Sequence, residues 1–143
     1  MDRVDEFIER FNDKTKNRIK KIKRFYFDVR NDDLKEIVDY LFNNLGCRLT
    51  TATAQETYSG LEVLYHFSHD ETGQYFCPRV LITDKEKPKM NSITSIVKGA
   101  EWIEREMFDL WGIKFEGHPR LEPLLTKDNP AGLRQPLRFR RNV

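Results

Sequence analysis

The amino-acid sequence predicts a two-layer α+β domain, in which helices cover a mixed, mostly antiparallel sheet. Two observations indicate this class. Segments with apolar residues at helical spacing are interspersed with segments of strand-like alternation, and several strand-like segments follow one another over short connections. Short connections between consecutive strands favour antiparallel pairing. The 143 residues, 38% of them hydrophobic and 34% charged, suffice for one domain with its own core.

Three segments are predicted to be helices. Residues 2–12 form a short amphipathic helix, residues 32–45 carry the longest apolar stripe, and residues 98–111 form the last helix. Gly46 and Gly112 follow the second and third of these segments, as is typical where a helix ends. One face of the last helix is predicted to be apolar and carries Ala100, Ile103, Met107, Leu110 and Trp111.

The predicted strands lie between the helices. Residues 25–29 are rich in aromatic and β-branched side chains, residues 47–53 alternate weakly, and residues 61–67 alternate clearly. A loop at 69–73 separates the last of these from a returning strand at 80–82, so we expect a β-hairpin with a long loop. The Lys-rich stretch around Pro88 is expected to be a connector.

The C-terminal quarter is predicted to differ from the rest of the chain. We divide the sequence into an α+β domain, 1–113, and an extended partner-binding tail, 114–143. The tail carries seven basic and three acidic residues, and a compact domain of this size lacks room for its apolar side chains. We therefore expect another protein to cover it. A long helix is excluded by Pro119, Pro123, Pro130 and Pro136.

Several kinds of chemistry lack support in the sequence. The two cysteines, Cys47 and Cys77, are too few for a structural zinc site or an iron–sulfur cluster. A metal site that combines them with His66 and His69 remains an open alternative. No nucleophile lies near His118 in the sequence, and no Gly-rich phosphate loop is present.

The segment Lys14–Arg24 leaves a second function open. It is strongly basic and precedes three aromatic residues, so it is a candidate nucleic-acid patch that would use neighbouring rings for stacking. A solvated basic edge is the competing interpretation. No apolar run reaches the roughly 20 residues of a membrane helix, and no secretory signal follows Met1. We expect a cytoplasmic protein that meets a membrane only through another protein.

Charged residues are dense on the last helix, and two interpretations of them are open. Arg105 and Asp109 lie four residues apart, and Glu101 lies four before Arg105. This spacing favours a solvent-exposed row of ion pairs on the polar side of the helix. The alternative is a buried or interfacial network that positions the tail.

Residues 100–119, AEWIEREMFDLWGIKFEGHP, closely resemble the signature of the 30-kDa subunit family of respiratory complex I, whose members are also called the C subunit of NADH:quinone oxidoreductase. This family also includes small subunits of membrane-bound, energy-converting NiFe hydrogenases and formate hydrogenlyases. The Glu-Arg-Glu, Asp-Leu, Gly-Ile, Phe and Gly-His-Pro elements match in order and spacing. Glu122 and Pro123 depart from the family, which commonly has a basic residue before its Leu pair. The short chain is closer in size to the hydrogenase-type members.

The resemblance implies a subunit without its own cofactor, in the hydrophilic arm of a membrane-anchored oxidoreductase. Such a subunit packs against the large catalytic subunit, which holds the quinone site or the NiFe centre, and against an iron–sulfur subunit. Iron–sulfur clusters, with a NiFe centre or flavin, are expected in these partners, and the complex on the inner face of the cell membrane. The resemblance assigns partner binding to Glu104, Arg105, Glu106, Asp109, His118, Leu124, Leu125, Arg134, Leu137 and Arg138.

Overall fold

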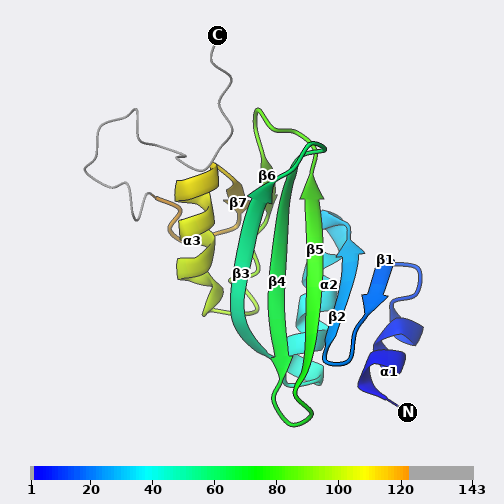
Figure 1. Cartoon of the computed structure of the whole chain (residues 1–143). Helices are drawn as coiled ribbons and strands as arrows, with labels where there is room; N and C mark the ends of the chain where they lie inside the picture. The colour runs from blue at the N-terminus through cyan, green and yellow to red at the C-terminus, as the bar shows by residue number, and fades with distance from the viewer. Residues whose placement is uncertain (1, 123–143) are drawn as a thin grey trace.

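The computed structural model describes residues 2–122, and Figure 1 shows the arrangement of their helices and strands. In chain order the elements are α1 (Arg3–Arg10), β1 (Thr15–Lys20), β2 (Arg24–Val29), α2 (Asn31–Asp39), the π-helix η1 (Tyr40–Asn44), β3 (Arg48–Glu56), β4 (Leu61–His69), β5 (Gln74–Ile82), β6 (Lys89–Asn91), α3 (Ala100–Trp111) and β7 (Lys114–Glu116).

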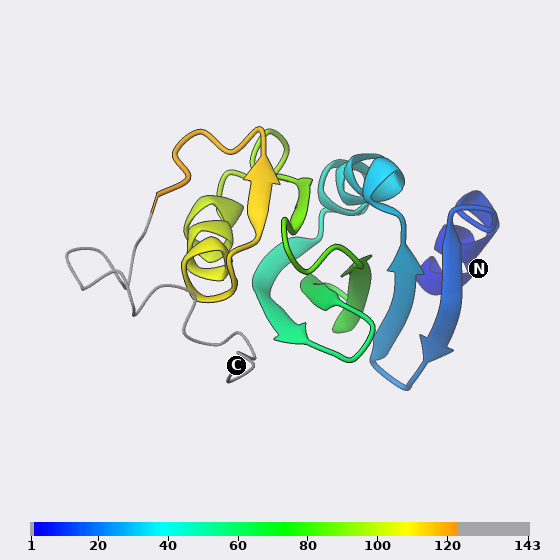
Figure 2. The same ribbon diagram turned by 90° about the horizontal axis from the view of Figure 1, so that it is seen from above.

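The main sheet has five strands in the order β1-β2-β5-β4-β3. Its neighbours are antiparallel except for β2 and β5, which run parallel. The chain returns from β2 to β5 through α2, η1 and the β3–β4 hairpin. The two views place α2 on one face of the sheet, and α3 with the short β6–β7 sheet beside β3 (Figures 1 and 2). The predicted α+β class with a mixed, mostly antiparallel sheet is confirmed.

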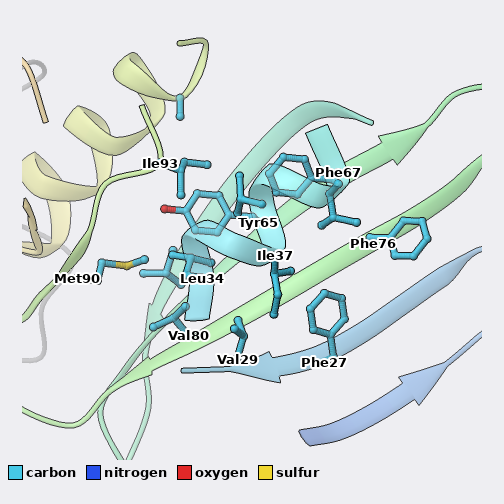
Figure 3. Close-up of a cluster of buried hydrophobic side chains, with 14 of the residues drawn as sticks. Phe27, Val29, Leu34, Ile37, Tyr65, Phe67, Phe76, Val80, Met90 and Ile93 are labelled. Atoms are coloured by element: carbon cyan, nitrogen blue, oxygen red, sulfur yellow. The ribbon is translucent and has the colours of Figure 1, made fainter. Parts of the chain in front are cut away.

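Aromatic side chains fill the core between the sheet and the first two helices. Strand alternation turns Phe25 and Phe27 of β2 and Phe76 of β5 to this face, where all three are fully buried. The ring of Phe7 in α1 lies 4.8 Å from that of Phe27 and 5.5 Å from that of Phe76, measured between centroids. Leu34 and Ile37 of α2 reach the same cluster (Figure 3).

Glycines end two of the helical segments as the sequence predicts. Gly46, with φ of 71°, follows the π-helical turn that completes the second helix. Gly112 has φ of 77° and caps α3, because its N–H donates to the Phe108 carbonyl at 2.8 Å. This left-handed conformation is one that a side chain with a Cβ rarely adopts.

Three strands lie outside the predicted strand segments. Within the basic segment 14–24 lies β1, and β6 lies within the predicted connector. The third, β7, occupies residues 114–116, which the sequence assigned to the extended tail, and Phe115 is buried there. The short strands β6 and β7 form a parallel pair, which sequence spacing did not reveal because their partners lie far apart in the chain. Residues 123–143 lie outside the described residues. Within 2–122, no helix has the length and apolarity needed to cross a bilayer.

Candidate functional site

Helix α3 organises the candidate site, because charged side chains on its inner side join it to two other segments. Ser92 and Ile93, which precede α3 in the chain, form hydrogen bonds with it. Residues 117–122, which follow β7, fold back along the helix. Two of the predicted residues on α3, Glu104 and Arg105, make these connections. The favoured prediction of a solvent-exposed ion-pair row is wrong, since Arg105 and Asp109 are each only 4% exposed.

Glu104 is fully buried between α3 and the segment that follows β6. Its Oε1 accepts a hydrogen bond from the Ser92 hydroxyl at 2.6 Å, and both carboxyl oxygens lie 3.3 Å from the Ile93 backbone nitrogen. Burial raises the pKa of Glu104 to about 7, although the hydrogen bonds from Ser92 and Ile93 oppose this shift. Near neutral pH this carboxyl group is therefore present in both protonation states.

Tyr65 adds a second buried polar group near this junction. Figure 3 shows its hydroxyl pointing from β4 towards the segment that carries Ile93. The hydroxyl is buried and forms no hydrogen bond with any described residue. Burial raises the pKa of Tyr65 well above its ordinary value, and the nearby Glu104 adds to the shift. The junction between α3 and the main sheet is thus polar at its centre.

Arg105 holds the last described residues against α3. Its Nε donates to the Glu122 carbonyl at 3.2 Å, and its Nη2 lies 3.6 Å from the Glu122 carboxylate. The guanidinium group also stacks over the Trp102 ring, with 4.9 Å between Cζ and the ring centroid. Leu121 packs against the hydrophobic core. Arg105 therefore holds Glu122, the last described residue, against α3.

His118 joins the same segment to the first turn of α3. Its Nε2–H donates to the Glu101 carbonyl at 2.9 Å, while Nδ1 accepts from the Arg120 backbone N–H at 3.0 Å. These two contacts together require the neutral tautomer with the proton on Nε2. The side chain fastens one segment of this chain to another.

Replacing His118 by alanine is expected to loosen the turn that precedes residue 122. Two hydrogen bonds are lost, each of which contributes about 1 kcal/mol. We expect the Arg120 amide to exchange its hydrogen about tenfold faster or more, as measured by NMR-detected hydrogen exchange. The exposed neighbour Lys114, replaced by alanine, serves as the control. An unchanged Arg120 exchange rate in the His118 variant would contradict this account.

The outward side of α3 carries other residues. Trp102 is 59% exposed, and Glu106, one turn further along, is exposed too. Leu110, which was predicted to share the apolar face, is only half-buried. Of the predicted partner-binding residues, Glu106 is thus open to a partner, while Glu104 lies inside the domain. Five further candidates lie outside the described residues: Leu124, Leu125, Arg134, Leu137 and Arg138.

The alternative metal site is not assembled in the described part of the chain. Within residues 2–122, no group of three or more His, Cys, Asp or Glu side chains is placed to hold a metal ion. Cys77 Sγ lies 3.7 Å from His66 Nδ1, and both cysteines are buried. Burial raises the pKa of the Cys47 thiol to about 12 and that of the Cys77 thiol to about 11. Both thiols are therefore protonated at neutral pH in the described structure.

The segment Lys14–Arg24 forms an edge strand and the turn after it. Lys14 pairs with Glu36, and Lys20 lies 3.1 Å from the Asp2 carboxylate, so part of its charge is neutralised within the chain. This arrangement favours the solvated basic edge over a nucleic-acid site.

The fold and the site together define a class of protein. It is an α+β domain with a mixed sheet, in which residues 100–119 hold the last described residues against the domain. The chain matches the family of the respiratory-chain NADH dehydrogenase 30 Kd subunit over residues 27–142, and it belongs to this family. The family predicted from the signature is confirmed.

Curated relatives agree with this assignment. The C subunit of the NADH-quinone oxidoreductase of Ruegeria pomeroyi is 36% identical over 105 residues, which cover 69% of this chain and 52% of that protein. The C subunit of the F(420)H(2) dehydrogenase of Methanosarcina mazei is 33% identical over 111 residues, 73% of this chain and 67% of that one. With the C/D subunit of the NADH-quinone oxidoreductase of Bacteroides thetaiotaomicron, identity is 38% over 79 residues. The chain spans about half of the Ruegeria protein and 15% of the Bacteroides protein.

Two solved structures share the fold. One belongs to the membrane-bound sulfane sulfur reductase, an archaeal respiratory membrane complex, with a TM-score of 0.77 over 87% of this chain and 75% of that chain. The other is a trypsin-resistant fragment of Nqo5, with a TM-score of 0.65 over 84% of this chain and all of that fragment. Both are 24% identical in sequence, a level at which the likeness shows the fold alone.

Proposed function

We propose that this chain is a structural subunit without its own cofactor, in the hydrophilic arm of a membrane-anchored respiratory oxidoreductase. It docks on the large catalytic subunit, which holds the quinone site or a NiFe centre, beside an iron–sulfur subunit. The iron–sulfur clusters, and a flavin or NiFe centre, belong to those partners. The complex lies on the inner face of the cell membrane, and this chain meets the membrane only through it.

One observation carries the proposal: α3 presents an exposed aromatic residue beside Glu122, the last described residue. Trp102 stacks on Arg105, and Arg105 in turn holds Glu122. An exposed tryptophan is a typical anchor of a protein–protein interface, because it buries a large apolar area at little cost in conformational entropy. Residues 123–143 follow Glu122 in the chain, and their arginines and leucines would supply further contacts with the partner.

The names of the relatives support the assembly role. They are C subunits of quinone- or F420-linked dehydrogenases, and the matched family is a respiratory-chain subunit family.

The test is affinity purification of the tagged full chain from its native cell in mild detergent. We expect a large catalytic subunit and an iron–sulfur subunit to purify with it. A chain that ends at residue 122 should remain folded, as thermal unfolding reports, yet lose the large subunit. The point variant Trp102→Ala should weaken recovery of the large subunit about tenfold or more, as removal of an interface anchor does.

Tyr58 provides the matched control, since it is a fully exposed aromatic residue in the β3–β4 turn, away from α3. Tyr58→Ala should leave recovery unchanged. The proposal fails if the chain purifies alone. The docking surface is wrong if both the truncated chain and Trp102→Ala recover the large subunit in full.

A further inference from the structure

The second face of the main sheet is open in the described structure. Strand register turns Tyr26 of β2 and Cys77 of β5 to the face opposite the aromatic core, and His66 of β4 shares it. Figure 2 shows α2 on the other side of the sheet and no described helix over this one. A sheet of this kind normally has a solvated, polar second face.

Apolar side chains and two hollows mark the open face. Leu81 of β5 is 47% exposed, and Ile19 of β1, which pairs with Tyr26, is 48% exposed. A hollow of about 190 Å³ is lined by Leu81 and Arg79, and a second of about 230 Å³ lies on the other side of Arg79 against Leu64. Both hollows are lined mostly by charged or polar residues, with Val29 and Leu81 in the first and Ala54 and Leu64 in the second. They suit a partner segment that carries polar as well as apolar side chains.

The open face and its border carry cations that have no acidic partner within residues 2–122. Arg24 lies over the Tyr75 ring at 5.0 Å and Lys21 over the Tyr26 ring at 6.0 Å, and neither forms an ion pair there. Lys16 is exposed beside the first hollow and is likewise unpaired among these residues.

Two carboxylates of the same face have partners in the chain, whereas Asp13 at the first hollow forms no ion pair among residues 2–122. Asp28 pairs with Arg79, and Glu62 accepts a hydrogen bond from Gln55 at 2.8 Å. The three cations Lys16, Lys21 and Arg24 outnumber Asp13 and Glu62, and this surplus is complementary to a partner with carboxylates.

Two other kinds of occupant fit less well. A strand added to the free edge is disfavoured, because β1 carries a bulge between Lys16 and Ile19 and exposed lysines, features that block edge-to-edge pairing. Nucleic acid would need free aromatic rings for stacking, and both Tyr26 and Tyr75 are already covered by cations of this chain.

We propose that the open sheet face is a second docking surface, which binds an acidic polypeptide segment with apolar side chains from another subunit of the same complex. The inference rests on the proposed function and extends it. The chain would bridge two neighbours, one along α3 and one across the sheet. Carboxylates of the partner would meet Lys16 and Arg24, and its apolar side chains would enter the hollows beside Arg79.

Photo-crosslinking in the assembled complex tests this surface. The photoreactive residue p-benzoylphenylalanine replaces Leu81 in the tagged full chain, and a second version carries it at Trp102 on α3. After irradiation of the purified complex, the Leu81 probe should join a peptide of another subunit that contains Asp or Glu. Crosslinks from Leu81 to residues 123–143 of this chain, to lipid, to nucleic acid or to nothing overturn the inference.

The Trp102 probe separates this inference from the proposed function. If Trp102 crosslinks to a subunit while Leu81 does not, the sheet-face inference fails and the assembly role stands. If the chain purifies without any other subunit, both fail.

Charge reversal gives an independent measurement. The double variant Lys16→Glu, Arg24→Glu should lower recovery of the crosslinked subunit by about tenfold or more, whereas Lys16→Arg, Arg24→Lys should retain it. Lys87→Glu, at an exposed lysine of the loop before β6, controls for net charge. Equal recovery with the reversed and the conservative pair would overturn the inference.

Discussion

Replacing Glu104 by glutamine is expected to stabilise the protein relative to wild type by an amount that grows with pH, by about 3 kcal/mol between pH 4.5 and pH 7. The cause is the raised pKa of this buried carboxyl group, about 7 in the folded protein against an ordinary value of 4.5. Glutamine keeps a side-chain oxygen that can accept the hydrogen bonds from Ser92 and Ile93, but it does not titrate.

The direction in which the free energy of unfolding changes with pH follows from the proton that Glu104 retains in the folded state. Below about pH 4.5 Glu104 is protonated in both the folded and the unfolded chain. Between pH 4.5 and 7 the unfolded chain releases this proton while the folded chain keeps it, so the free energy of unfolding falls as pH rises. Above about pH 7 the carboxylate is charged in both states, and the loss is complete.

Urea unfolding of both proteins at half-unit steps from pH 4 to pH 8.5 measures the effect. Only the difference between variant and wild type is compared, because every other titrating group then cancels. The control is Glu106→Gln, at an exposed glutamate two positions along the same helix, for which we expect a difference within about 0.5 kcal/mol at every pH. A difference for Glu104→Gln that does not change with pH would show that this carboxyl group is not protonated by burial.

Truncating Phe7 to alanine is expected to lower the free energy of unfolding by about 3–5 kcal/mol. This fully buried ring is the contact between α1 and the sheet, with centroids of Phe11, Phe27 and Phe76 at 5.0, 4.8 and 5.5 Å. Its removal leaves a cavity and withdraws the main apolar contact of a helix of only eight residues, too short to be stable alone.

Two further variants serve as comparisons for Phe7→Ala. Phe7→Leu keeps most of the apolar volume and should cost clearly less than alanine. Ile22→Ala removes an apolar side chain that is 93% exposed and should stay within about 0.5 kcal/mol of wild type. Chemical unfolding followed by near-ultraviolet circular dichroism reports all three. Equal losses for Phe7→Ala and Ile22→Ala would mean that α1 does not depend on this cluster.

The proposed arrangement gives the subunit two separate surfaces with different chemistry. Along α3, an exposed tryptophan lies beside the point where residues 123–143 begin, and the open sheet face carries unpaired cations and two hollows of mixed polar and apolar lining. Two surfaces on one small domain would let it hold two neighbours in a fixed relative position, which is a structural contribution that requires no cofactor.

Local sequence patterns predicted the elements whose signals lie within a few residues. The helices at residues 2–12, 32–45 and 98–111 and the aromatic strand at 25–29 all correspond to observed elements. Helical spacing and strand alternation record which side chains point to the core, and a glycine after a helix marks its end through backbone conformation. The signature at residues 100–119 likewise identified the family from contiguous residues.

The burial of Glu104 could have been suspected from spacing. It lies four residues after Ala100 and three before Met107, both of which are buried, so these three residues lie along one stripe of α3. Its charged side chain suggested an exposed position instead, because a glutamate is almost never fully buried unless it is paired. Its partners, Ser92 and Ile93, lie more than ten positions away.

The amino-acid sequence alone therefore determined the helices, the aromatic strand, the α+β class and the family. Tertiary structure decided which strands pair, that β2 and β5 run parallel, that residues 114–116 form a strand, and that Glu104, Arg105 and Asp109 of α3 are buried. The physical reason is the separation along the sequence between the residues that determine each feature. A helix or strand pattern repeats within a few positions, whereas a buried carboxyl group and a strand pair depend on residues brought together only when the whole domain folds.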